Sequence, residues 1–229
     1  QRLSAAMGPL GRGATARLSS GTAYYPTMGN GPFPAIAIVP GFLNVGPEVG
    51  DWGSFYASWG IICVVTNSGA SDFPDARARY LLNAIRDLKA ANTQSGSPLF
   101  GKLSGQYGTS GYSMGGGGTT IASNEDKTLR SSVGLAPWSP VGRGIVTPTL
   151  HICGSADGTA PCGSNARPSY DAIPATTPKM LLVVNGGGHL TSWFGPGDTP
   201  GGISGGWALA FNKVFLEGDE RWRPLLLST

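Results

Sequence analysis

Short apolar runs recur along the chain, each with the length of a β-strand. They cover residues 35–39, 61–66, 106–112, 132–136, 148–153 and 179–184. Several of them are apolar at successive positions, which is typical of strands covered on both faces. These runs therefore predict six strands of a sheet that lies inside the protein.

Helical patterns lie between the runs, over residues 76–91, 114–124, 164–173 and 203–216. The first carries an apolar stripe at helical spacing, made of Tyr80, Leu81, Ala84, Ile85 and Leu88. Ahead of them, residues 14–25 predict an antiparallel hairpin or an edge strand. Because strands alternate with helices, we expect an α/β fold whose central sheet is mostly parallel and has helices on both faces. No linker or repeat interrupts the pattern, so residues 1–229 are expected to form a single domain.

The segment 111–118 reads Gly-Tyr-Ser-Met-Gly-Gly-Gly-Gly and lies between a predicted strand and a predicted helix. This is the context of a nucleophile elbow, in which a serine sits on a sharp strand-to-helix turn. The residues two before and two after the serine must be small, and Gly111 and Gly115 meet this need. A plain glycine-rich turn is the alternative, since Gly-x-Ser-x-Gly also occurs by chance. The strand–helix context favours Ser113 as a nucleophile.

A serine hydroxyl needs a base to take its proton, and the chain has two histidines, His151 and His189. His151 lies within the apolar run 148–153, so we expect it to be buried and structural. His189 follows the run 179–184 and a glycine-rich loop, beyond a strand's carboxyl end, where the sites of parallel sheets collect. We therefore assign the base to His189; an ordinary loop histidine is the alternative.

The acid of a triad should lie between the serine and the histidine in this chain order, where Glu125, Asp126, Asp157 and Asp171 stand. The first two end the helix after the serine and are expected to point to solvent, and Asp171 lies in a predicted helix. Asp157 alone comes just past a strand, so we assign the acid to it; a turn aspartate of an Asp-Gly pair is the alternative. The order Ser113, Asp157, His189, each beyond a separate strand, is that of an α/β-hydrolase.

A tetrahedral intermediate of acyl transfer needs hydrogen-bond donors for its oxyanion. The residue after the nucleophile, Met114, supplies one backbone N–H. The second donor is expected from the loop after the first central strand. There Phe42 follows Gly41, which gives the backbone freedom to turn inward.

Hydrophobic residues make up 40% of the 229 residues and charged residues only 13%, which argues against disorder. The formal net charge is +3, and Arg77, Arg79 and Arg86 form the only local basic group. We interpret this group as one solvated helix face, so nucleic acid is not an expected partner. No apolar run reaches the roughly 20 residues of a membrane helix, and no cysteine or histidine spacing of a metal site occurs. Neither a membrane nor a cofactor is therefore expected.

The chain has three cysteines. Cys63 lies inside the apolar run 61–66, so we expect a buried free thiol. Cys153 and Cys162 are close in sequence and bracket Asp157, so we expect a disulfide between them. A disulfide and sparse lysine favour an exported protein. The chain begins at Gln1 without a signal-like apolar stretch, which we interpret as a mature chain whose signal was removed or as a shortened chain.

Three segments together resemble bacterial cutinases and PET-hydrolysing polyesterases: residues 111–118, Ala136-Pro137-Trp138 and the loop 185–189. Pro40-Gly41-Phe42 also fits the oxyanion loop of that family, and the resemblance runs from about residue 14 to residue 216. It implies that Phe42 and Met114 supply the oxyanion donors and that Phe42 and Trp138 form an aromatic clamp around the acyl part of an ester. Packing is the alternative role for these two aromatic side chains. Thr159 stands where the family has a branched apolar residue near the acid loop, and we expect it to contact substrate.

The chain departs from the family pattern in lacking its terminal cysteine pair and in residues 190–194 after His189. Only residues 139–147 separate Trp138 from the next strand run, which leaves no room for a lid. We therefore expect a secreted, monomeric serine esterase with an open site that acts on ester or polyester substrates. The alternatives are a small-ester carboxylesterase, a lipase, a dienelactone-hydrolase relative, and a binding protein on an inactive hydrolase scaffold.

Overall fold

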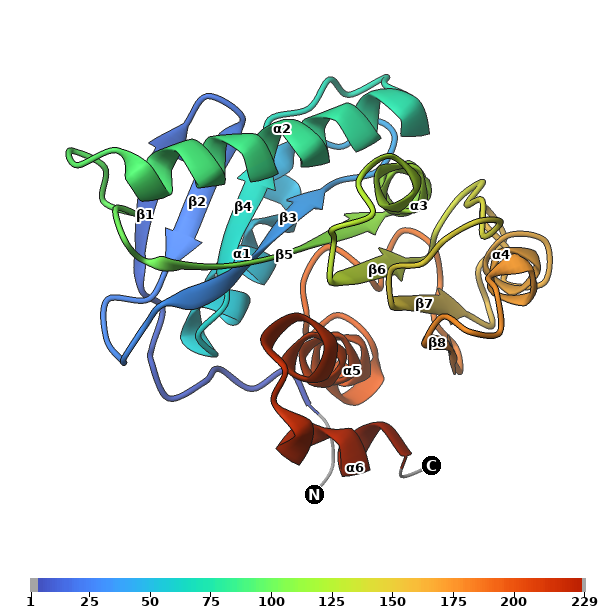
Figure 1. Ribbon diagram of the computed structural model, residues 1–229. Coiled ribbons are helices and arrows are strands. Elements are labelled where there is room, and N and C mark those ends of the chain that lie inside the picture. The colour runs from blue at the N-terminus through green and yellow to red at the C-terminus, as the bar shows by residue number, and fades with distance from the viewer. Residues whose placement is uncertain (1–3, 228–229) are drawn as a thin grey trace.

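The centre of the protein is a mostly parallel sheet of eight strands (Figure 1). The structure is a computed structural model that describes residues 4–227. Residues 1–3 and 228–229 of the expected domain lie outside the described residues. The strands are β1 (Ala14–Leu18), β2 (Gly21–Tyr25), β3 (Phe33–Val39), β4 (Ile62–Thr66), β5 (Leu103–Tyr112), β6 (Ser131–Leu135), β7 (Thr149–Gly154) and β8 (Lys179–Val184). Their order in the sheet is β1-β2-β4-β3-β5-β6-β7-β8. Strand β2 pairs antiparallel with both β1 and β4, and the remaining pairs are parallel. All six predicted strands and the predicted hairpin are confirmed.

Helices cover both faces of the sheet, as expected. They are α1 (Gly50–Ser58), α2 (Pro74–Thr93), α3 (Met114–Glu125), α4 (Ala166–Ala172), α5 (Ile203–Asn212) and α6 (Arg223–Leu227). Helices α2 and α3 lie on one face, whereas α1, α5 and α6 lie on the other, and α4 lies beyond β7 and β8 (Figure 1). The expected long C-terminal helix is in fact α5 followed by a π-helical turn, Lys213–Glu217.

Strand β3 contributes to the hydrophobic cores on both faces of the sheet, because successive side chains of a strand point to opposite faces. Ile36 and Ile38 belong to the core that includes α1 and α5. Ala35 and Ala37 belong to the core that includes α2. The small alanine side chains let the 20-residue helix α2 lie close to the centre of the sheet.

Helix α1 was not expected from the sequence, because Gly50 and Gly53 lower its intrinsic helix propensity. The helix nonetheless buries Trp52 and Tyr56 against the sheet. A Cβ at Gly53 would lie only 2.4 Å from the ring of Tyr24, so glycine is what allows α1 to approach β2. Tertiary packing therefore outweighs local propensity in this segment.

The prediction of a solvated basic face is wrong for Arg77. Arg79 and Arg86 are exposed as expected, but Arg77 is completely buried. Arg77 lies one helical turn before Leu81 and therefore belongs to the buried stripe of α2. Spacing along the helix places this side chain inside the protein despite its charge.

Candidate active site

Ser113 lies on the sharp turn between β5 and α3, with φ 54° and ψ −116°. Positive φ is rare for a residue with a side chain and must be enforced by the surroundings. A Cβ at Gly111 would lie 2.2 Å from the carbonyl oxygen of Gly115, so the turn closes only because residue 111 is glycine. The backbone N–H of Ser113 also donates to Leu135 O in β6 at 2.9 Å. These contacts fix the nucleophile elbow that the sequence predicts.

Ser113, His189 and Asp157 form a continuous chain of hydrogen bonds. Ser113 Oγ lies 2.9 Å from His189 Nε2, and His189 Nδ1 lies 2.7 Å from Asp157 Oδ2. The three residues follow the carboxyl ends of β5, β8 and β7, so the parallel sheet brings them to one edge. All three are buried, with at most 8% of each residue exposed. The carboxylate therefore acts on the imidazole with little competition from water.

Asp157 is oriented by the backbone of its own loop. Its Oδ1 accepts hydrogen bonds from the N–H of Thr159 at 2.9 Å and of Ala160 at 2.7 Å, which leaves Oδ2 for His189. The disulfide between Cys153 and Cys162 closes this loop at its base and confirms the expected pairing.

The loop of His189 is held by two aromatic side chains. The hydroxyl of Tyr112 donates to the carbonyl oxygen of His189 at 2.8 Å, and Trp193 Nε1 donates to Gly188 O at 2.8 Å. Burial, with a smaller effect of the nearby carboxylates, raises the pKa of Tyr112, so this hydroxyl stays protonated and able to donate. This role of Tyr112 was not predicted from the sequence, although the position of Tyr112 beside the nucleophile is a signal for one.

The two expected oxyanion donors are the N–H groups of Met114, which follows Ser113 in the chain, and of Phe42, which follows Gly41. Gly41 packs against the nucleophile so closely that a Cβ there would lie 3.0 Å from Ser113 Cβ. Within residues 4–227, neither the N–H of Phe42 nor that of Met114 donates a hydrogen bond to another protein group. Met114 is the first residue of α3, where backbone N–H groups have no partner inside the helix.

The residues expected to contact substrate are Phe42, Trp138 and Thr159. Phe42 is 39% exposed, and its ring lies 6.0 Å from that of Phe73, which is exposed beside it. Trp138 is half-buried, and its backbone N–H donates to Ser113 O at 2.8 Å, which places it next to the nucleophile. Thr159 is exposed on the acid loop. Of these residues, only Phe73 was not predicted from the sequence, because its contact with Phe42 joins two segments that are distant along the chain.

His151 and Cys63 lie away from the triad, in β7 and β4. His151 is completely buried and lies 3.0 Å from Ser169 Oγ through Nε2, and burial lowers its pKa to about 4. Burial raises the pKa of the Cys63 thiol, which makes this free cysteine unreactive. Among the described residues, no group of His, Cys, Asp or Glu side chains is arranged to hold a metal ion.

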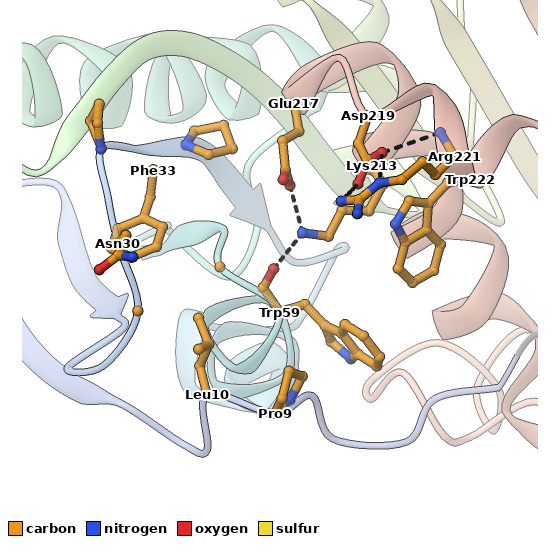
Figure 2. Close-up of a pocket in the computed structure, with 14 residues that line it drawn as sticks. Pro9, Leu10, Asn30, Phe33, Trp59, Lys213, Glu217, Asp219, Arg221 and Trp222 are labelled. Atoms are coloured by element: carbon orange, nitrogen blue, oxygen red, sulfur yellow. Dashed lines mark hydrogen bonds and ion pairs between the residues drawn. The ribbon is translucent and has the colours of Figure 1, made fainter.

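A cavity of about 370 Å³ lies at the opposite edge of the sheet from the triad (Figure 2). It is lined by Phe33, where β3 begins, and by Trp59 just ahead of β4. Lys213 donates to the carbonyl oxygen of Trp59 at 2.6 Å and pairs with Glu217, and Arg221 pairs with Asp219 (Figure 2). The charged groups of this cavity neutralise one another and tie the C-terminal segment to the sheet.

A model of the PET hydrolase-like family matches residues 3–229. The chain belongs to this family. Its relatives include a bis(hydroxyethyl) terephthalate hydrolase of Streptomyces coelicolor, 32% identical over 93% of this chain and 67% of the relative. Cutinase est1 of Thermobifida alba is 33% identical over 90% of this chain and 68% of the relative. Cutinase 2 of Thermobifida cellulosilytica is 32% identical over 90% of this chain and 77% of the relative.

Membership of the PET hydrolase-like family confirms the resemblance of residues 111–118, 136–138 and 185–189 to PET-hydrolysing polyesterases. It also confirms the α/β-hydrolase fold and the prediction that the chain is a carboxylic ester hydrolase. The oxyanion donors and substrate contacts of this chain remain predictions that rest on the geometry above.

We expect His151 to make the stability of the PET hydrolase-like protein fall in mild acid. Its pKa is about 4 in the folded protein and 6.5 when unfolded, so between these values only the unfolded state binds the proton. Relative to a His151→Gln variant, the wild-type protein should lose about 2 kcal/mol of unfolding free energy between pH 7 and pH 4.5. Urea unfolding of both proteins at the two pH values measures this. If the difference in unfolding free energy between the two proteins does not change with pH, the prediction is wrong. A large loss of kcat in folded His151→Gln would contradict the structural role of His151.

The disulfide should stabilise the acid loop. A bond that closes a loop of eight residues contributes roughly 2–3 kcal/mol. The Cys153→Ser/Cys162→Ser double variant is therefore expected to unfold at lower denaturant concentration and to have a lower kcat, because the Asp157 loop gains freedom.

Thiol titration in denaturant without reductant checks the pairing directly. It should find one thiol in the wild-type protein, Cys63, and none in a Cys63→Ala control. Three thiols in the wild-type protein would contradict the disulfide.

Proposed function

We propose that the protein is a serine esterase that cleaves carboxylic esters, polyesters of the terephthalate type among them, through a covalent acyl-enzyme. The observation that carries this proposal is the hydrogen-bond chain Ser113–His189–Asp157 in a member of the PET hydrolase-like family. The printed names of the relatives, a terephthalate-ester hydrolase and cutinases, support the substrate class.

Ser113 Oγ attacks the carbonyl carbon of the ester while His189 Nε2 takes its proton. The Asp157 carboxylate keeps the other imidazole proton on Nδ1 and stabilises the imidazolium that forms. His189 then gives the proton to the leaving alcohol. In the second half of the reaction water attacks the acyl group, again with His189 as base and then acid, and Ser113 is released.

The negative oxygen of each tetrahedral intermediate is bound by the N–H groups of Phe42 and Met114. Both groups lie beside Ser113 and are free of protein acceptors among the described residues. Preorganised donors of this kind are worth about 10²–10³ in kcat each. Met114 adds the favourable electrostatics of a helix N-terminus, since it begins α3.

We propose that the substrate lies in an open groove beside Ser113, which suits a polymer chain better than a lipid tail. In this proposal Phe42 and Trp138 form flat walls for the acyl ring, and Thr159 also contacts the substrate. The fully described segment 136–148 between β6 and β7 carries no helix or strand that would act as a lid. A polymer segment in a film reaches such a groove without having to enter a tunnel.

The protein acts as a secreted monomer in one domain, without cofactor and without nucleic acid. The Cys153–Cys162 disulfide supports export, because such bonds persist in oxidising compartments. The low formal net charge of +3 gives little attraction to nucleic acid. Among residues 4–227, none of the helices has the length and apolar character needed to span a bilayer.

Replacing Ser113 by alanine should remove turnover and keep the fold. We expect kcat on p-nitrophenyl acetate to fall by about four orders of magnitude or more, with little change in melting temperature. A fluorophosphonate should label the wild-type protein at Ser113, and a Ser95→Ala variant, changed at an exposed turn serine, should react like wild type. Near-normal turnover by Ser113→Ala would mean that another group is the nucleophile.

Replacing Trp138 by alanine should separate polymer hydrolysis from that of a small ester. Release of soluble product from a polyester film is expected to drop at least about tenfold, and turnover of p-nitrophenyl acetate less than about threefold, because the small ester needs less of the wall. A Phe100→Ala control removes an exposed aromatic residue near the opposite end of β5 and should change neither rate. Equal losses on both substrates would argue against the clamp, and preference for long-chain triglycerides would favour a lipase.

A further inference from the structure

Arg77 is completely buried, and its guanidinium contacts backbone carbonyl groups. Its Nε donates to Asp72 O at 2.9 Å and its Nη1 to Pro40 O at 2.8 Å. Its Nη2 donates to Gly69 O at 3.3 Å and to Ala70 O at 3.1 Å. A buried charge is costly unless it is fully hydrogen-bonded, and here four carbonyl oxygens supply the partners.

These four acceptors lie on two different loops. Pro40 begins the loop after β3 that carries Phe42, and residues 69–72 lie between β4 and α2. The two loops meet again where Leu43 N donates to Ala70 O at 2.6 Å and where the rings of Phe42 and Phe73 pack together. Arg77 connects the two loops by hydrogen bonds, and its own backbone belongs to helix α2.

Among the four acceptors, the Pro40 carbonyl is the one next to the segment that contacts Ser113. It lies close to the first turn of α3, since a Cβ at Gly115 would lie 2.6 Å from Pro40 O. The same carbonyl belongs to the peptide unit ahead of Gly41, which packs against Ser113. Rotation of that peptide would turn the next one, whose N–H belongs to Phe42. Arg77 holds Pro40 O ahead of Gly41, and Ala70 O, which Arg77 also contacts, holds the N–H of Leu43 beyond Phe42. The peptide that carries the Phe42 N–H lies between these two held points, which restricts its direction.

We infer that Arg77 is a positioning residue for catalysis, which holds the Phe42 N–H of the proposed oxyanion hole in its productive orientation. The inference rests on the proposed function, because it gives the Phe42 N–H its role. Arginine suits this task better than lysine, since its planar fork spans several acceptors in fixed directions. Arg77 touches no reacting atom and acts only through the loop.

The test compares Arg77→Lys and Arg77→Met with the wild-type protein on p-nitrophenyl acetate. Loss of one well-placed oxyanion donor costs about 10²–10³ in kcat, and a displaced donor costs less. We therefore expect kcat to fall about 10- to 100-fold, with KM changed less than about threefold, because the donor matters mainly in the transition state. Affinity for a phenylboronic acid, which forms a tetrahedral adduct with the serine, should fall by the same factor as kcat.

Two control variants on the same helix separate positioning from stability. Arg79→Met removes an exposed charge two residues away and should leave kcat, KM and boronate affinity unchanged. Leu88→Ala removes a fully buried side chain at the far end of the stripe. It should lower the melting temperature and leave kcat per folded molecule near that of wild type. Arg77→Lys keeps the charge and serves as the reporting variant if Arg77→Met does not fold.

The inference is overturned if a folded Arg77 variant keeps its kcat and boronate affinity, or if Leu88→Ala reproduces both losses. It is also overturned if KM alone changes. Each of these results leaves the proposed function intact as long as the wild-type protein hydrolyses esters and is labelled at Ser113. Absence of hydrolysis and labelling in the wild-type protein would instead contradict the proposed function itself.

Discussion

The positive-φ backbone of Ser113 is the constraint on which the rest of the site depends. A side chain in this conformation points out of the strand-to-helix turn, towards the carboxyl ends of β7 and β8, where Asp157 and His189 lie. Three backbone contacts maintain it: the hydrogen bond to Leu135 O, the one from Trp138 N, and the contact between Gly111 and Gly115. Without them the strain would relax, since a few kcal/mol suffice to move a residue out of such a region.

Buried polar groups organise the edge of the sheet around this serine. Arg77 joins the loop of Phe42 to the loop ahead of α2, Tyr112 holds the loop of His189, and the backbone N–H groups of Thr159 and Ala160 orient Asp157. Most of these bonds involve backbone carbonyl or N–H groups rather than other side chains. Loops that lack regular pairing thereby satisfy their backbone groups and become rigid enough to carry catalytic residues.

The two ends of the sheet have different chemistry. At the carboxyl end of the strands, the Asp157 carboxylate and the His189 imidazole form a hydrogen-bond chain that ends at the hydroxyl of Ser113. At the opposite end, the lysine, arginine and carboxylates of the cavity in Figure 2 pair with one another and leave no group free to react. Parallel strands explain this difference, because only their carboxyl ends are followed by the loops that converge on Ser113.

The sequence by itself determined the strands, the triad and the disulfide. Continuous apolar runs mark strands that are buried on both faces, and the elbow motif and the order serine–aspartate–histidine depend on residues adjacent to those runs. Only the tertiary structure decided the existence of α1, the burial of Arg77 and the contact of Phe42 with Phe73. Each of these depends on groups brought together from distant parts of the chain: the ring of Tyr24 beside Gly53, the Pro40 carbonyl that accepts from Arg77, and the two loops that carry Phe42 and Phe73. Local propensity and charge favour the opposite outcome for α1 and Arg77, and the free energy of long-range packing and hydrogen bonding outweighs them.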